Sequence, residues 1–308
     1  MSSSRLISAT GSQIDALGPR ELLRAIGRSE GRVVMAQSLL WFQGLQLGIT
    51  NPELEAAFGA DMLLLNGYDT RPEAVMPGLM RGFTPDDGYW TLAEVRALTR
   101  RAVGVYLECA RGAIAPGAQG RAATPENAAR ALAQGADFLV LGGNPATGVH
   151  TDDILAAVRT LRNELGSEPL IMAGKWEDGS VEPVLGDPRS ARPAAAIIED
   201  FIESGTDIVT LPAPGSRQGI TTDMIRECVE VVHANGALAL TFLNGSVEGT
   251  DVDTIRQIGL LMKQTGADIH AIGDGGLAGC ALPENVFQLS LTLKGRSHTY
   301  WRMAASSR

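Results

Sequence analysis

Short runs of aliphatic residues alternate along the chain with segments of helical periodicity. Near-continuous apolar runs are typical of strands buried on both faces, as in a parallel sheet covered by helices. The runs cover residues 33–37, 61–66, 103–108, 137–142, 169–175, 207–211, 237–244 and 268–274. The pattern therefore predicts eight strands, each followed by a helix.

The segments between the runs begin with recognisable helix caps. Thr91 stands three residues before Glu94, the spacing of a capping box. Thr124 precedes Pro125, which suits an N-cap followed by proline in the first turn. Further predicted starts are Pro52, Thr151, Thr221, Asp251 and Pro283.

A Gly-x-Asp motif recurs just before every second strand. Its aspartates are Asp61, Asp137, Asp207 and Asp268. The glycine suits a left-handed helix C-cap. Recurrence before the second, fourth, sixth and eighth strands indicates a module of two strands and two helices, repeated four times.

Eight alternating strands and helices favour one (β/α)8 barrel, the TIM barrel, over a doubly wound open sheet. The open sheet is the alternative, but no early G-x-G-x-x-G turn follows the first strand. The 308 residues fit a barrel over 31–295, an N-terminal helical extension over 1–30 and a C-terminal arm over 296–308. Such an extension is expected to plug the N-terminal mouth.

Composition narrows the class of protein. The formal net charge of −9 argues against nucleic acid as a partner. Three widely spaced cysteines show no disulfide or zinc spacing, which suits a reducing compartment. The chain has neither an apolar leader nor a run of 18 apolar residues, so we expect a cytoplasmic protein without membrane spans.

A polar residue ends each predicted strand. Active sites of barrels lie at the C-terminal strand ends, so these side chains are expected to converge on one mouth. The alternative is that strand ends are polar only because they approach solvent. The residues are Gln37, Asn66, Glu108, Asn144, Lys175, Thr210, Asn244 and Asp274.

Lys175 is one of only three lysines and follows the apolar run of residues 170–174. At a barrel mouth, desolvation lowers a lysine pKa and makes the amine a Schiff-base nucleophile or a general base. Beside a carboxylate, the same amine stays charged and grips an anion, or forms a rim ion pair.

Glu108 and Asp274 are the carboxylates at strand ends. They suit a general acid and base, or ligands of a divalent cation such as Mg²⁺ or Mn²⁺. A rim network with arginines is the alternative. His150, after the fourth strand, is a further candidate near the mouth. Alternation places His270 on the face of Asp274, either as a hydrogen-bonded core residue or beneath the carboxylate to orient it.

The last two loops suggest a phosphate site. Glycine lets backbone N–H groups approach phosphate oxygens, and barrels often bind phosphate in these loops. Arg217, after the sixth strand, is a candidate clamp for phosphate or carboxylate, or a solvated arginine in a rigid turn. The predicted phosphate-binding residues of the loops are Gly245, Ser246, Gly275 and Gly276.

Three segments resemble a known family. Residues 57–66, residues 210–217 and the Gly-Asp-Gly-Gly run at 273–276 are similar to an uncharacterised bacterial TIM-barrel family associated with sugar-uptake operons. They are loosely similar to BtpA-like barrels as well. The resemblance, over about residues 30–300, implies the barrel and a phosphorylated metabolite and implies no particular reaction.

These features lead to one main functional hypothesis and two others. We expect a lyase (aldolase-like) or an isomerase that acts on a small phosphorylated sugar or keto acid, with Lys175, Glu108 and Asp274 as catalytic residues. The second hypothesis is a divalent-metal-dependent hydrolase using Glu108, Asp274 and His150. The third is a barrel without catalysis that binds a sugar phosphate as a regulator. A homo-oligomer is expected from the terminal arm.

Overall fold

The computed structural model describes residues 5–110 and 118–308 and shows a closed barrel of eight parallel strands. Each strand pairs with the next, and β8 pairs with β1. The predicted (β/α)8 TIM barrel is confirmed. The strands are β1 (Val33–Leu39), β2 (Met62–Asn66), β3 (Ala102–Glu108), β4 (Phe138–Gly142), β5 (Ile171–Ala173), β6 (Ile208–Pro212), β7 (Leu238–Leu243) and β8 (Ile269–Ile272).

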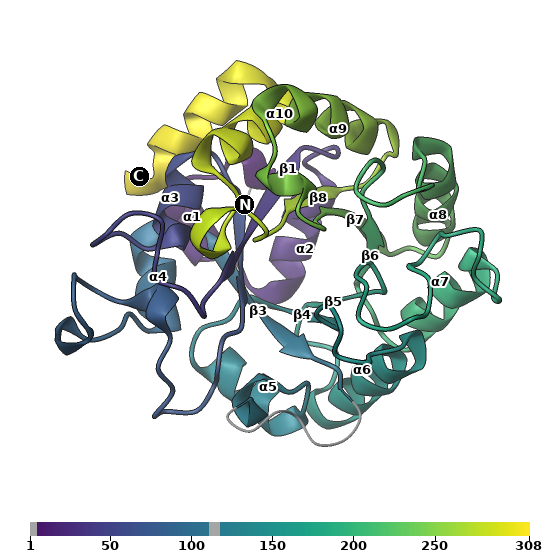
Figure 1. The fold of residues 1–308 in the computed structure, drawn as a ribbon, viewed down its shortest axis with the longest axis horizontal. Coiled ribbons are helices and arrows are strands. Elements are labelled where there is room, and N and C mark those ends of the chain that lie inside the picture. The colour runs from purple at the N-terminus through teal and green to yellow at the C-terminus, as the bar shows by residue number, and fades with distance from the viewer. Residues whose placement is uncertain (1–4, 111–117) are drawn as a thin grey trace.

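Helices form a ring around the strands (Figure 1). The predicted caps at Thr91, Thr124, Thr221 and Asp251 are confirmed, because each side chain accepts a backbone N–H of the first turn. The outer helices are α3 (Asn51–Ala57), α4 (Leu92–Thr99), α5 (Pro125–Ala133), α6 (Thr151–Leu165), α7 (Ala194–Glu203), α8 (Thr222–Ala234), α9 (Val252–Gln264) and α10 (Pro283–Ala304). Short 3-10 turns lie at Leu6–Ser8, Pro77–Leu79, Pro85–Asp87, Gln119–Arg121, Val247–Gly249, Leu277–Gly279 and Ala305–Ser307.

Alternate strand residues enter two separate apolar layers. Val34 and Ala36 of β1 pack in the layer between the strands and the outer helices. Val33 and Met35 pack inside the barrel with residues such as Met172 of β5. Both faces of each strand are therefore buried, which explains why the strands read as continuous apolar runs.

The Gly-x-Asp aspartates tie neighbouring strands together at their N-terminal ends. The Asp207 backbone N–H donates to the Ile171 carbonyl, and the Asp207 carboxylate accepts the Ile171 N–H, both at 2.9 Å. The same two bonds join Asp61 to Val34, Asp137 to Val103 and Asp268 to Ala239. The repeat seen in the sequence is thus a clamp between consecutive strands, used four times around the barrel.

The N-terminal segment closes one end of the barrel. It contains α1 (Gly11–Asp15) and α2 (Pro19–Gly27), and α2 lies inside the ring of outer helices in Figure 1. Leu6 and Ile26 are buried in the same cluster as the barrel interior. Arg20 of α2 bonds to the clamp residue Asp207, which ties this plug to the strands. Residues 1–4 of the predicted extension lie outside the described residues.

The C-terminal helix α10 is interrupted at Gly295, where φ is +72°. Just before this break, Lys294 donates to Asp61 and to the Gly59 carbonyl, and both members of the ion pair are fully buried. The break thus lies next to the predicted start of the C-terminal arm. In the described part of the chain, no helix combines the length and apolar character needed to cross a bilayer.

Candidate active site

Alternation along the strands decides which polar side chains reach the mouth. Every second residue of a strand points to the same side of the sheet, which we call its parity. Gln37 points inward with Val33 and Met35, and Asn66 points inward with Met62 and Leu64. The inward-facing row of side chains is therefore apolar in the interior and ends in predicted site residues at the C-terminal rim of the barrel. The other predicted residues with inward parity are Glu108, Asn144, Thr210 and Asn244.

A chain of hydrogen bonds joins three of these residues, Gln37, Asn66 and Asn144, with Asp274, which follows β8. Gln37 Nε2 donates to Asp274 Oδ2 at 2.8 Å, and Asn66 Nδ2 donates to the same oxygen at 3.1 Å. Asn66 Nδ2 also donates to Asn144 Oδ1 at 2.9 Å. The predicted convergence on one mouth is therefore found for these side chains.

The chain ends at Glu108, which receives three donors. Asn144 donates through Nδ2 at 2.6 Å and through its backbone N–H at 2.9 Å, and Thr147 donates at 3.0 Å. Burial raises the pKa of Glu108, while the bonds from Asn144 and Thr147 oppose the rise. Burial likewise raises the pKa of Asp274 to about 6, against the bonds from Asn66 and Gln37. Two carboxyl groups that titrate nearer neutrality than usual thus share one hydrogen-bonded chain.

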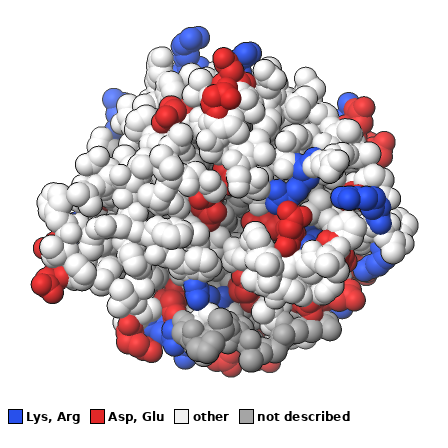
Figure 2. Space-filling view, viewed as in Figure 1, with Lys and Arg blue, Asp and Glu red and all other residues white. Residues whose placement is uncertain are grey.

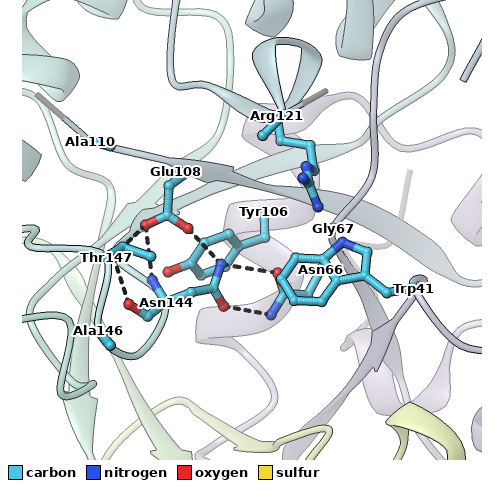
Figure 3. Close-up of a pocket in the computed structure, with 11 residues that line it drawn as sticks. Trp41, Asn66, Gly67, Tyr106, Glu108, Ala110, Arg121, Asn144, Ala146 and Thr147 are labelled. Carbon is cyan, nitrogen blue, oxygen red and sulfur yellow. Dashed lines mark hydrogen bonds between the residues drawn. The ribbon is translucent and has the colours of Figure 1, made fainter. Parts of the chain in front are cut away.

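A cavity of about 360 Å³ opens along this chain on the side of β2, β3 and β4 (Figure 3). Its size suits a small metabolite. Described residues that line it include Asn66, Glu108 and Asn144, together with Arg121, Tyr106 and Trp41.

Aromatic rings form the base of the mouth. Trp176 stacks on Phe242 with ring centroids 5.3 Å apart, and Tyr106 meets Trp176 edge to face at 5.9 Å. Gly142 makes this packing possible, because a Cβ there would lie 2.6 Å from the Trp176 ring and 2.8 Å from the Tyr106 hydroxyl. The site is therefore closed below by large, rigid side chains.

A second acidic group lies on the side of β5 and β7. Glu177 Oε1 accepts from Asn244 at 2.8 Å and from Trp176 at 3.1 Å, while Oε2 is buried without a partner among the described residues. Burial, followed by the charge of Asp274, raises the pKa of Glu177 to about 8. Figure 2 shows acidic side chains beside the hollow at the centre of the face, with basic side chains next to them.

Lys175 is buried but does not line the cavity. Ala173 belongs to the outer apolar layer and Trp176 to the interior, so Lys175 has outward parity. Its amine donates to the Glu177 carbonyl within the loop after β5. Burial lowers the pKa of this lysine, opposed by the charges of Glu182 and Asp178. The structure places the amine where it holds the loop of Glu177, and its predicted catalytic role stays a prediction.

The glycine loops predicted for phosphate already hold a carboxylate. Gly275 N–H donates to Glu248 Oε1 at 2.9 Å, and Glu248 is buried. Gly245 and Ser246, both with positive φ, precede the turn that carries Glu248. Gly276 lies next to Gly275 on this loop. Burial raises the pKa of Glu248. A phosphate bound at the Gly275 N–H would have to displace the Glu248 carboxyl group or lie against it. Phosphate binding at these loops therefore stays a prediction.

Arg217 braces the mouth from the loop after β6. It donates to Asn244 Oδ1 at 3.1 Å and to the Asn244 carbonyl at 3.2 Å, and it lies 3.2 Å from Asp178. Its predicted role as a clamp for a substrate anion remains a prediction, since these contacts already engage the guanidinium.

Neither predicted histidine lies at the cavity. His270 bonds to Thr241 Oγ1 at 2.8 Å and to the Gly31 carbonyl at 3.2 Å, so it is a hydrogen-bonded core residue. The alternative, a histidine that orients Asp274, is wrong because Asp274 is held by Gln37 and Asn66 while His270 bonds to Thr241 and Gly31. His150 caps α6 and lies 3.7 Å from Glu182, on the loop after β5.

The predicted metal ligands are not gathered into a metal-binding cluster in the described part of the chain. Two asparagines bridge Glu108 and Asp274, and the described residues contain no group of three or more His, Cys, Asp or Glu placed to hold a metal ion. The proposal of Mg²⁺ or Mn²⁺ therefore stays a prediction without a ligand cluster to support it.

Several residues of the mouth were not predicted. Tyr106 was detectable, because it precedes Glu108 by two positions and shares its inward parity. Trp41, Arg121, Glu177 and Glu248 lie beyond strand ends, where periodicity no longer fixes a direction.

Comparison with known families assigns the chain to one family. One family model, described as a domain of unknown function (DUF7916), matches residues 7–308. The chain belongs to this family. No curated protein matches the sequence. The predicted resemblance to a sugar-uptake family and to BtpA-like barrels therefore stays a prediction for this DUF7916 member.

Solved structures resemble this DUF7916 protein in fold. An archaeal fructose 1,6-bisphosphate aldolase has a TM-score of 0.54 at 14% identity, covering 90% of this chain and 99% of that chain. A Schiff-base-forming fructose-1,6-bisphosphate aldolase has a TM-score of 0.52 at 13% identity, covering 89% and 97%. The carboxyl transferase domain of Rhizobium etli pyruvate carboxylase has a TM-score of 0.52 at 12% identity, covering 95% and 51%. At these identities the similarity shows the barrel fold.

Proposed function

We propose that this protein is an enzyme, a lyase (aldolase-like) or an isomerase, that acts on a small phosphorylated sugar or keto acid. The observation that carries the proposal is the chain of hydrogen bonds from Asp274 through Asn66 and Asn144 to Glu108, of which the last three residues line the cavity. Paired titratable groups with shifted pKa values at a concave site are typical of acid–base catalysis.

The proposed chemistry is proton transfer at a carbon next to a carbonyl group. Glu108 lines the cavity and accepts the proton, while the carbonyl oxygen takes up the negative charge of the enolate. Asn66 and Asn144 fix the positions of the carboxyl groups. Return of the proton to a neighbouring atom gives an isomerase. In an aldolase-like lyase the base instead takes the proton of the hydroxyl group β to the carbonyl, so that the bond between the α and β carbons breaks into an aldehyde and the same enolate. Protonation of the enolate carbon then completes the second product. That the fold neighbours above include two aldolases is in keeping with this choice.

Asp274 is proposed as the second acid–base group. With its pKa at about 6 it is mostly ionised at neutral pH, whereas Glu177, at about 8, is mostly protonated. The mouth thus offers a proton acceptor and a proton donor at the same pH, which proton shuttling between two substrate atoms requires.

A Schiff base at Lys175 is a second candidate mechanism. Burial lowers the pKa of Lys175, which favours the neutral, nucleophilic amine. Its bond to the Glu177 carbonyl favours a positioning role instead. The first mechanism is preferred because Glu108 lines the cavity.

Exchange of carbon-bound hydrogen with solvent tests the proposal before the full reaction is known. Small keto acids and sugar phosphates would be incubated in D₂O with wild type, Glu108→Gln and Asp274→Asn, and deuterium at the carbon next to the carbonyl followed by NMR. We expect exchange with wild type and a loss of about 100-fold or more in Glu108→Gln. Binding without exchange would favour the regulator, and turnover that EDTA abolishes would favour the metal-dependent hydrolase.

A further inference from the structure

The guanidinium group of Arg121 and the phenol ring of Tyr106 face the same cavity, and neither takes part in the proposed proton transfer. Arg121 and Tyr106 both line it, together with Trp41 (Figure 3). Resting on the proposed function, we propose that the substrate is a small carbonyl compound whose anionic group, carboxylate or phosphate, binds Arg121 while its carbonyl oxygen accepts a hydrogen bond from Tyr106.

Arg121 lies over an aromatic ring at the cavity. Its Cζ lies 4.9 Å from the centre of the Trp41 ring. Stacking engages the face of a guanidinium and leaves its in-plane N–H groups for a carboxylate or phosphate. Within residues 5–110 and 118–308, no ion pair occupies Arg121. The charge of Arg121 lowers the pKa of Asp69 and opposes the rise in the pKa of Glu108, so both carboxyl groups lie near it. A fork of donors held at a cavity outside an ion pair is the arrangement that recognises an anion.

The backbone is shaped to admit this stack. Gly67 has a φ of +76°, and a Cβ there would lie 2.4 Å from Nε1 of Trp41. Glycine at this position therefore lets the indole lie against the loop after β2, under Arg121. The stacked pair is a built part of the cavity wall.

The Tyr106 hydroxyl is the second, independent observation. The residue is 1% exposed, and its hydroxyl has no hydrogen-bond partner among the described residues. An unpaired buried hydroxyl is costly, and a bound acceptor would remove that cost. Burial raises the pKa of Tyr106 well above its usual value, so the group stays a neutral donor. It suits an oxygen that becomes negative during proton abstraction.

Charge explains why the anion belongs at Arg121. Glu108 makes this wall acidic, Asp274 is bonded to the lining residue Asn66, and Glu248 occupies the glycine loop. A phosphate or carboxylate placed beside those groups would be repelled. Arg121 is the basic residue among the described residues that line the cavity.

Calorimetric titration with two matched pairs of probes tests the inference. 2-Oxobutanoate and uncharged butanone differ in the carboxylate, and dihydroxyacetone phosphate and dihydroxyacetone differ in the phosphate. We expect one charged probe to bind wild type, which identifies the anion, and its uncharged analogue to bind about tenfold more weakly or worse. Arg121→Gln should abolish this preference. Tyr106→Phe should weaken both members of the pair without lowering the melting temperature, because the lost hydroxyl has no protein partner.

Arg81→Gln is the matched control. The Cζ of Arg81 lies 4.5 Å from the centre of the Trp90 ring, and neither residue is among those that line the cavity. Probe binding by this variant should equal that of wild type. Binding of charged probes that is unchanged in Arg121→Gln, equal binding of charged and uncharged probes, or no binding of either charged probe overturns the inference. Asp274→Asn separates it from the proposed function. If wild type and Asp274→Asn both bind the probe but wild type shows no deuterium exchange, the acid–base proposal alone is refuted. If deuterium exchange is the same in Arg121→Gln as in wild type, this inference alone is refuted.

Discussion

Asn66 uses one amide nitrogen to hold two neighbours: Nδ2 donates to Asp274 at 3.1 Å and to Asn144 at 2.9 Å. Both N–H groups of the amide are thereby used, so its oxygen faces the Asn144 amide, 3.4 Å away. The orientation of the asparagine is fixed from both sides. Asn66 is thus a positioning residue between the two halves of the mouth.

Removal of this amide should raise the pKa of Asp274. The bond from Asn66 opposes the effect of burial, so Asn66→Ala should move the pKa from about 6 upward by roughly one unit. ¹³C NMR titration of labelled aspartate carboxyl groups would measure it, with Asp274→Asn identifying the signal. Asn235→Ala, which removes an exposed amide bonded to the Val231 carbonyl, is the control. An unchanged Asp274 titration in Asn66→Ala would refute the positioning role.

The barrel was predictable because burial on both faces leaves a direct trace in the sequence. β4 is apolar along its whole length and β2 is apolar up to its last residue, Asn66, and the four Gly-x-Asp motifs mark the ends of alternate helices. The role of Asp207 as a clamp was not predictable. The clamp needs Ile171 at the start of β5, 36 residues before Asp207 in the sequence. Local periodicity cannot show that these two residues are partners.

The candidate site was predictable only as far as the strands reach. Gln37, Asn66 and Glu108 were predicted because each is the polar residue that ends a strand, and the structure shows that each shares the inward direction of the buried interior residues. Lys175 also stands beyond an apolar run, but β5 ends at Ala173 and the amine turns to the loop. Arg121 comes from a 3-10 turn in the loop after β3, so only tertiary structure brings it to the cavity.

The stability of the protein should fall as the pH rises through the titration of Glu177. Burial raises its folded pKa from 4.5 to about 8, so the folded protein binds this proton more tightly than the unfolded chain. Stability is then greatest below about 4.5 for this group, and it is lost between about pH 4.5 and pH 8. Glu177→Gln cannot ionise and should flatten the fall in the free energy of unfolding between pH 6 and pH 9, measured by urea denaturation.

Two further variants check the origin of that effect. Glu55 is buried behind β1 with its pKa raised to about 8, so Glu55→Gln should flatten the same window independently. Asp86→Asn, at an exposed side chain, should leave the pH dependence unchanged. If Glu177→Gln retained the wild-type difference between pH 6 and pH 9, Glu177 would have to be ionised at neutral pH.

Borohydride reduction separates the two roles of Lys175. Because its amine donates to the Glu177 carbonyl and does not line the cavity, we expect no covalent adduct with a keto acid or sugar phosphate under reduction, as measured by mass spectrometry. Lys175→Met should still lower deuterium exchange by loosening the loop of Glu177, and Lys175→Arg should partly restore it. An adduct mapped to Lys175 would instead establish the Schiff-base mechanism.

The buried ion pair between Asp61 and Lys294 should dominate the stability of the barrel base. Asp61→Ala removes the acceptor of the Val34 N–H and leaves an ammonium group in a site with no solvent exposure. Loss of one partner of a buried pair costs about 3–5 kcal/mol. The expected result is a drop of that size in the free energy of unfolding, measured by urea denaturation at pH 7.

Asp268→Ala is the matched comparison, because it breaks the same clamp one module away. Asp268 accepts the Ala239 N–H at 2.9 Å, but its partner His233 is 41% exposed and can be rehydrated. We therefore expect a loss of only about 1–2 kcal/mol. The difference between the two variants measures the cost of the stranded ammonium, and the double variant Asp61→Ala, Lys294→Met should recover part of it. Equal losses for Asp61→Ala and Asp268→Ala would mean that the backbone clamp, rather than the ion pair, sets the stability at this end of the barrel.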